Sequence, residues 1–201
     1  MNILYLHGFQ SSSNSPTVQY LKQQLTKSKH TFYCFDLPHQ PKSAIQKIKQ
    51  KIAELKIDII IGTSLGGVYA YNFELPKICI NPAFQFELKE GKYQYFNKRD
   101  NGETQFDITD QDVNYFNSLV VSYKFKLPKD KLFNTSYILI GTDDTYVKFD
   151  KLKQFTNQYD EFIYAKFEHR LTENIIDTYL LDLVEKLSQS INSINEMNIH
   201  E

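Results

Sequence analysis

The sequence predicts an α/β fold with a mainly parallel sheet of about six strands flanked by helices. Short apolar runs alternate along the chain with amphipathic helical patterns, which is typical of this class. Several runs are apolar throughout rather than at every second residue, as expected of strands covered on both faces. The expected strands are Asn2–Leu6, Thr31–Phe35, Ile57–Ile61, Lys77–Ile80, Ser136–Ile140 and Glu161–Ala165.

Helices fit between these strands. In the first helix Ser15 is expected as the N-cap and Pro16 as the first residue, because proline has the backbone angle that a helix start needs. Apolar residues at helical spacing follow, and they are Val18, Leu21 and Leu25. The later helices are expected at Lys42–Leu55, directly after Ser64, near Phe149–Asn157 and at Glu173–Ser190. The polar tail after Ser190 is expected to fray.

The length of 201 residues predicts a single domain, residues 1–201, that is large enough to bury a core. Residues 83–135 interrupt the alternation of strands and helices between two core strands. Within them, Thr109-x-x-Asp112 has the pattern of a capping box at a helix start. We interpret the segment as a cap or lid inserted in the domain; the alternative is a packed surface excursion without a role in binding.

Composition narrows the classes of function. Hydrophobic residues make up 41% and charged residues 23%, and the net charge of -1 gives no basic field for nucleic acid. No apolar run reaches the length of a membrane span, and the N-terminal run is too short for a signal peptide, so we expect a cytoplasmic protein. Cys34 and Cys79 lie in apolar runs and are expected as buried free thiols, and no Cys/His cluster indicates a metal site. The sequence leaves the oligomeric state open.

One motif in the sequence indicates a catalytic residue. Gly62-Thr63-Ser64-Leu65-Gly66 follows an apolar strand and precedes a helix-compatible stretch. Gly-x-Ser-x-Gly at a strand-to-helix junction is the pattern of the nucleophile elbow of α/β-hydrolases. The turn holds the serine hydroxyl exposed at a helix N-terminus, where backbone N–H groups favour negative charge. Ser64 is therefore the candidate nucleophile; the alternative is a glycine-rich bend without catalytic function.

A serine nucleophile needs a general base, usually a histidine oriented by a carboxylate. In α/β-hydrolases the order along the chain is serine, acid, histidine. Only His169 and His200 follow Ser64, and His200 lies in the polar tail. His169 follows the last expected strand and precedes the C-terminal helix, so it is the candidate base. His30 and His39 are expected as surface or loop residues.

The acid should follow the strand before the histidine. Two aspartates, Asp143 and Asp144, lie just beyond the expected strand Ser136–Ile140. In many α/β-hydrolases the acid stands in Gly-x-x-Asp-x-x-Val, and Gly141, Asp144 and Val147 fit that spacing. Asp144 is the candidate acid, and Asp143 remains the alternative.

An oxyanion hole needs two backbone N–H groups that point at the carbonyl oxygen of the intermediate. One is expected from Leu65, the residue after the nucleophile, and the other from a loop after an early strand. Phe9 is the candidate for the second N–H, because Gly8 lets the backbone approach the site. His7 lies in the wrong chain order for the base, and we interpret it as a residue that anchors this loop.

Four motifs in order resemble the YqiA-type esterase family, a small branch of the α/β-hydrolases. They are Asn2–Phe9 with Ser11-Ser12, Gly-Thr-Ser-Leu-Gly-Gly at 62–67, Asn81-Pro82-Ala83 and His169-Arg170. The resemblance covers nearly the whole chain. It implies an intracellular serine hydrolase without a cofactor that acts on small-molecule carboxylic esters or acyl thioesters, with the triad Ser64, Asp144 and His169.

The chain departs from the family pattern at two places. Phe167-Glu168 stands where members have glycines, and Thr142-Asp143-Asp144 stands where they have Thr-Gly-Asp. Neither change removes a triad member. An acyl-CoA thioesterase or acyltransferase is the alternative within the enzyme class, and a non-catalytic α/β-hydrolase-like binding protein is the alternative outside it.

Overall fold

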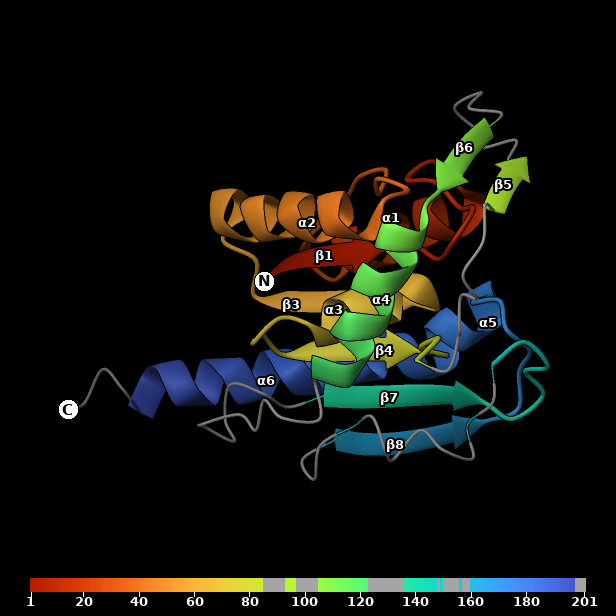
Figure 1. The fold of residues 1–201 in the computed structure, drawn as a ribbon. Helices are drawn as coiled ribbons and strands as arrows, with labels where there is room; N and C mark the ends of the chain where they lie inside the picture. The colour runs from red at the N-terminus through yellow and green to blue at the C-terminus, as the bar shows by residue number, and fades with distance from the viewer. Residues whose placement is uncertain are drawn as a thin grey trace.

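A computed structural model describes residues 1–84, 93–96, 105–122, 136–147, 149, 156 and 160–197. The predicted α/β architecture is confirmed: six parallel strands form one sheet with helices on both faces (Figure 1). In chain order the strands are β1 (Asn2–Leu6), β2 (Thr31–Cys34), β3 (Ile59–Thr63), β4 (Lys77–Ile80), β7 (Ser136–Gly141) and β8 (Asp160–Ala165).

The strand order across the sheet is β2-β1-β3-β4-β7-β8, and every neighbouring pair is parallel. The chain therefore runs from β1 to β2 on one side and then crosses back to β3 on the other side. Where the strand order reverses in this way, the connections leave in opposite directions and open a crevice beyond the carboxyl ends of the two strands. In this chain the reversal lies at the ends of β1 and β3, where the Gly8 loop and Ser64 follow.

The helices divide into two layers. They are α1 (Pro16–Lys27), α2 (Pro41–Leu55), α3 (Leu65–Tyr71), α5 (Glu173–Ile175), a π-helical stretch (Ile176–Leu180) and α6 (Leu181–Met197). One buried cluster joins the sheet to α1, α5, the π-helical stretch and α6, and a second joins its other face to α2 and α3. The protein is thus a three-layer α/β/α sandwich.

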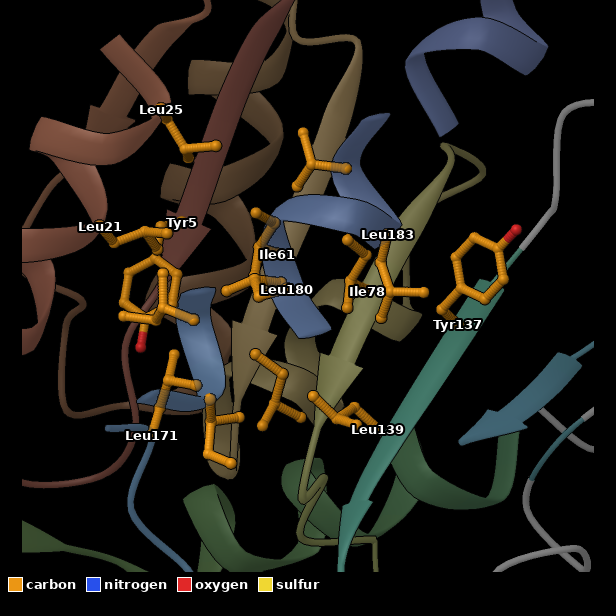
Figure 2. Packing of buried hydrophobic residues seen from close by; sticks show 14 of the residues in the cluster. Tyr5, Leu21, Leu25, Ile61, Ile78, Tyr137, Leu139, Leu171, Leu180 and Leu183 are labelled. Carbon is orange, nitrogen blue, oxygen red and sulfur yellow. The ribbon is translucent and has the colours of Figure 1, made fainter. Parts of the chain in front are cut away.

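Alternate residues of each strand supply the two clusters. Along β1, Ile3 and Tyr5 belong to the α1 and α6 side, whereas Leu4 and Leu6 belong to the α2 and α3 side. Figure 2 shows the first side, where leucines of α1 and of the C-terminal helices meet strand residues such as Ile78. Because both faces are covered, both alternating sets are apolar, which explains the continuous apolar runs in the sequence.

The predicted insertion, residues 83–135, contains an antiparallel ribbon and a helix. The ribbon is β5 (Tyr93–Phe96) and β6 (Gln105–Ile108), and the helix is α4 (Asp110–Ser122). The predicted capping box is present: Thr109 Oγ1 accepts the N–H of Asp112 at 3.3 Å, and Asp112 Oδ2 accepts the N–H of Thr109 at 3.0 Å. Phe116 of α4 packs in the same cluster as Tyr69 of α3, and the ribbon lies toward the end of the sheet to which the strand arrows point (Figure 1).

Several predicted boundaries were wrong. Strand β3 begins two residues later than predicted, at Ile59, because Lys56 takes a left-handed turn (φ 49°) and the Ile57 N–H still bonds to Ile52 O. The C-terminal helix continues past Ser190 to Met197 instead of fraying.

Two other predictions about helices have different outcomes. Ser15 is the N-cap of α1, but its side chain makes no capping hydrogen bond. Most of the helix predicted near Phe149–Asn157 lies outside the described residues. Within the part of the chain that the structure describes, no helix is both long and apolar enough to cross a membrane.

Candidate active site

Ser64 stands in the tight turn between β3 and α3. Its backbone is left-handed, with φ 54° and ψ -117°, which is a costly conformation for a residue with a side chain. The flanking glycines are required by space: a Cβ on Gly62 would lie 2.7 Å from Gly67 N, and one on Gly66 would lie 2.7 Å from His7 O. The turn can therefore bring α3 against the ends of β1 and β3 only because both positions lack side chains.

The three residues predicted as a triad lie together at the carboxyl end of the sheet. His169 Nε2 is 3.1 Å from Ser64 Oγ, and His169 Nδ1 is 2.6 Å from Asp144 Oδ2. The Asp144 side chain is fully buried, whereas that of His169 is 23% exposed. The residues come from loops after β3, β7 and β8, so a continuous hydrogen-bonded path links a buried carboxylate to a serine hydroxyl.

The structure distinguishes the two candidate acids by geometry. The second oxygen of Asp144, Oδ1, accepts the N–H groups of Tyr146 at 2.7 Å and Val147 at 3.1 Å, which fixes the carboxylate. Asp143 is exposed, and its carboxylate accepts a long hydrogen bond from the Thr142 hydroxyl at 3.4 Å. Of the two aspartates, Asp144 is therefore the one that reaches His169.

The loop after β1 lies directly against the nucleophile. A Cβ on Gly8 would be 3.4 Å from Ser64 Cβ, so the backbone at Gly8 is in van der Waals reach of the serine. Phe9 comes next in this loop, and Leu65 is the first residue of α3. First-turn N–H groups of a helix have no partner within the helix, so the Leu65 N–H needs a partner from outside it. Leu65 thus follows Ser64 directly, and Phe9 follows the glycine whose backbone lies beside Ser64. Their roles in an oxyanion hole stay predictions.

His7 anchors this loop, as the sequence predicted. It is buried, and its Nε2 accepts the N–H of Leu37 at 3.1 Å. Nδ1 must then carry the proton, which it donates to Gly8 O at 2.9 Å. His7 is thus held as a neutral bridge between the loop after β1 and the loop after β2.

The other upstream histidines differ from expectation in part. His30 lies in the loop between α1 and β2, which agrees with the loop alternative, but it is buried with 9% exposure rather than at the surface. Its Nε2 lies 3.1 Å from Glu185 Oε1 of α6. Glu185 is distant from His30 in sequence, so the local sequence pattern could not reveal this contact. His39 is half-buried in the loop before α2.

An open pocket of about 410 Å³ adjoins the imidazole of His169. Its lining is polar, and the residues are Asp143, Thr145, Tyr146, Glu168, His169 and Arg170. The Tyr146 ring lies beside the His169 imidazole with 5.3 Å between ring centroids, although Tyr146 is 81% exposed. Glu168 is exposed and contributes to the lining of this pocket. Among the described residues no cluster of three or more histidine, cysteine or acidic side chains could hold a metal ion.

Sequence reasoning missed several residues that hold the site together. Asp36 Oδ1 accepts the N–H of Ser13 at 2.7 Å and so ties the loop after β1 to the loop after β2. Behind the elbow, the Tyr5 and Thr63 hydroxyls are 3.0 Å apart and share a buried hydrogen bond. These polar residues at the ends of apolar strands were visible as exceptions to the apolar pattern, but their partners are far away in sequence.

Comparison with known proteins agrees with this architecture. Residues 2–185 match the sequence model of the uncharacterised protein family UPF0227, which is the YqiA family. The chain belongs to this family. The match covers both ends of the sheet and all residues of the candidate site, so this YqiA-family protein carries the site within the family's shared region.

Solved structures show the fold of this YqiA-family protein to be that of the α/β-hydrolases. Alpha/beta hydrolase domain-containing protein 10 from mouse is 14% identical, with 98% of this chain and 90% of that chain covered and a TM-score of 0.65. A monoacylglycerol lipase from Paleococcus ferrophilus is 14% identical over 94% of each chain, with a TM-score of 0.67. Est1E from Butyrivibrio proteoclasticus is 15% identical, with 95% of this chain and 88% of that chain covered and a TM-score of 0.67.

Proposed function

We propose that this protein is a serine hydrolase that cleaves carboxylic esters or acyl thioesters through an acyl-enzyme. The observation that supports the proposal most directly is the continuous contact from Asp144 through His169 to Ser64. That path gives a weak nucleophile a base within hydrogen-bond reach and gives the base an orienting carboxylate. The lipases and esterases among the structures of this fold support an ester as the substrate.

In the first step Ser64 Oγ attacks the carbonyl carbon while His169 Nε2 takes the hydroxyl proton. The carbonyl oxygen becomes an oxyanion, which the N–H groups of Leu65 and Phe9 stabilise. Asp144 accepts the hydrogen bond of His169 Nδ1 and stabilises the imidazolium that forms. The bond to the leaving group then breaks, and His169 gives its proton to the departing alcohol or thiol. The acyl group remains on Ser64.

In the second step a water molecule takes the place of the leaving group. His169 removes one of its protons, and the water oxygen attacks the acyl carbon of the Ser64 ester. The second intermediate collapses, the proton returns from His169 to Ser64 Oγ, and the carboxylic acid leaves. No cofactor enters either step, and the serine hydroxyl is restored.

The surroundings of the site suggest where the two halves of the substrate lie. His169, the residue that protonates the leaving group, lines the polar pocket, so we place the alcohol or thiol portion there. We propose that the 83–135 segment is a cap that shapes the acyl side, because its ribbon lies toward the carboxyl end of the sheet in Figure 1.

A fluorophosphonate probe tests the proposal. Such a probe forms a bond from phosphorus to an activated serine oxygen and releases fluoride, so it reports the Ser64–His169 pair without knowledge of the substrate. We expect the wild type to be labelled and Ser64→Ala and His169→Ala to remain unlabelled. With a p-nitrophenyl ester, each variant should lower kcat by about 10⁶-fold, with a residual rate from the oxyanion hole.

An intact, folded wild type that stays unlabelled would refute the proposal and favour the non-catalytic binding protein instead. If labelling succeeds, matched acyl esters and acyl-CoA thioesters of the same chain length decide the leaving group. A kcat/KM at least tenfold higher for the thioester would assign the protein to the thioesterases. Transfer of the acyl group to an added alcohol in place of water would assign it to the acyltransferases.

A further inference from the structure

Asn81 follows β4 directly and has no part in the mechanism above. It is fully buried, and its backbone is left-handed with φ 43°. A non-glycine residue adopts this conformation rarely, although asparagine tolerates it better than most. Its position in Asn81-Pro82-Ala83 therefore combines two costs, a buried polar group and an unusual backbone. Both must be compensated by contacts of the side chain.

The Asn81 amide joins the loop that carries the acid to the loop that carries the base. Its Oδ1 accepts the N–H of Gly141 at 2.7 Å, at the end of β7 and three residues before Asp144. Its Nδ2 donates to Glu168 O at 3.1 Å and to His169 O at 3.4 Å. One amide thus bonds to both segments whose side chains form the 2.6 Å contact between Asp144 and His169.

The same short segment also holds the nucleophile. Ala83 N–H donates to Ser64 O at 3.2 Å, and Ser64 N–H donates to Ile80 O at 2.9 Å. The Asn81 N–H itself donates to Leu139 O of β7 at 2.9 Å. The residues after β4 are therefore bonded to the backbone at the nucleophile, beside the acid and at the base.

Only an asparagine satisfies these contacts. The site needs one acceptor for Gly141 N–H and donors for two carbonyls, and a short side chain amide is the one group that offers both. Glutamine carries the same amide one methylene farther from the backbone, so from this backbone position it would displace the amide from its three partners. Aspartate would keep the acceptor but place a carboxylate against two carbonyl oxygens.

We infer that Asn81 is a positioning residue that sets the distance between Asp144 and His169 by clamping the Gly141 turn to the Glu168–His169 backbone. The inference rests on the proposed hydrolase function, since the geometry that Asn81 holds is that of its triad. It acts on the residues that react rather than on the substrate. Loss of the clamp therefore lowers kcat and leaves KM nearly unchanged.

Two substitutions separate the two ends of the clamp. Asn81→Gly removes the amide and tolerates the left-handed backbone, so both ends are lost without new strain. Asn81→Asp retains an acceptor for Gly141 N–H and loses the donors to the base loop. The matched control is Asn2→Gly. The Asn2 amide also donates to two successive carbonyls, Leu55 O at 2.9 Å and Lys56 O at 3.1 Å, but at the opposite end of the sheet.

The experiment measures kcat and KM with a p-nitrophenyl ester, the melting temperature, and hydrogen exchange of the Gly141 amide by NMR. Misplacement of a catalytic group by about 1 Å costs on the order of 10²-fold, so we expect Asn81→Gly to lower kcat by about that factor, with KM changed less than about threefold. The Gly141 amide should exchange about tenfold faster. Asn81→Asp should lower kcat by a similar factor, because it also loses the donors to the base loop. Its Gly141 amide should exchange as slowly as in the wild type, because the acceptor is retained. Asn2→Gly should lower the melting temperature at unchanged kcat.

A wild-type kcat in Asn81→Gly, or a loss no larger than that of Asn2→Gly at equal stability, would overturn the inference. If the wild type itself hydrolyses no ester and is not labelled by the probe, the proposed hydrolase function is refuted, and the role of Asn81 needs a separate measurement. The contact between Asp144 and His169 is then measured by NMR, through the downfield signal of the His169 Nδ1 proton that bonds to Asp144. This signal should vanish in Asn81→Gly and persist in Asn2→Gly; its persistence in both would refute the positioning role.

Discussion

Replacing Gly66 with alanine tests whether the close approach of α3 to β1 sets the geometry of the site. A Cβ at Gly66 would come closest to Leu6 O, and it would lie 2.6 Å from the carbonyl carbon of Leu6 and 2.7 Å from His7 O. Ordinary contact begins near 3.4 Å, so the added methyl is about 0.7 Å too close to His7 O and overlaps Leu6 O by more than that. The atoms it meets are backbone, and β1 is bonded to strands on both sides, so no side chain can move to make room.

The relaxation must therefore separate α3 from the end of β1. The His7 carbonyl immediately precedes Gly8 and Phe9, so the displacement reaches the loop that we propose supplies the second oxyanion donor. Overpacking typically costs about 1–3 kcal/mol and occasionally more, which a domain with roughly 5–15 kcal/mol of stability survives. A shift approaching 1 Å at a catalytic group lowers kcat by about 10²-fold. We expect a folded Gly66→Ala variant with that loss.

The neighbouring glycine provides the control. A Cβ at Gly67 would meet Pro82 Cβ at 3.1 Å and Gly62 O at 3.2 Å, which a shift of a few tenths of an ångström relieves. Gly67→Ala should keep kcat within about threefold of the wild type, because alanine also favours the helix. Both variants are compared by p-nitrophenyl ester kinetics and by urea unfolding. Full activity in Gly66→Ala, or equal losses in the two variants, would refute the reasoning.

Two further predictions follow from the site and the core. Asp144→Asn should lower kcat by about 10⁴-fold, whereas Asp143→Asn should change it little; the reverse order in ester kinetics would transfer the role to Asp143. Burial raises the pKa of the Cys34 and Cys79 thiols to about 12, from an ordinary 9.0. Iodoacetamide at pH 8 should therefore modify neither thiol in the native protein and both in urea, and rapid native alkylation would contradict this. The thiols of the unfolded protein ionise at a lower pH than those of the native protein. Their burial therefore contributes fully to the free energy of unfolding below about pH 9, and this contribution declines as the pH rises toward 12. Urea unfolding across that pH range measures the decline.

The sequence predicted the strands of the sheet well and their boundaries less well. Each apolar run became a strand because burial on both faces leaves few positions for polar residues. The start of β3 was misplaced because Ile57 is buried like a strand residue, with 5% exposure, although its N–H still bonds to the end of α2. Burial and strand pairing are different properties, and an apolar pattern reports only the first.

The candidate site was predictable for a topological reason. Parallel strands end at one edge of the sheet, so polar residues just beyond the ends of β3, β7 and β8 must lie near one another. Ser64, Asp144 and His169 each occupy such a position. The Gly-x-x-Asp-x-x-Val pattern of many α/β-hydrolases favoured Asp144 over Asp143, and of the two it is Asp144 that contacts His169.

The role of Asn81 could not be predicted in the same way. Its contacts reach Gly141, Glu168 and His169, which are 60 to 88 residues away in sequence, and they depend on its left-handed backbone. Neither property has a periodic signature. The one available signal was a polar residue followed by proline at the end of a buried strand, which indicates a fixed turn without indicating what the turn holds.

Ser64 and Asn81 both have unusual backbone conformations, and the two turns stabilise each other. They end the adjacent strands β3 and β4, and each costs on the order of 1–3 kcal/mol in isolation. Ser64 N–H donates to Ile80 O before Asn81, and Ala83 N–H after Asn81 donates to Ser64 O. Each strained turn is thus closed by hydrogen bonds to the other, and the Asn81 amide extends this closure to the acid and base loops. The nucleophile is therefore held by its neighbour strand as well as by its own elbow, so relaxing either turn should disturb the alignment of Ser64 with His169.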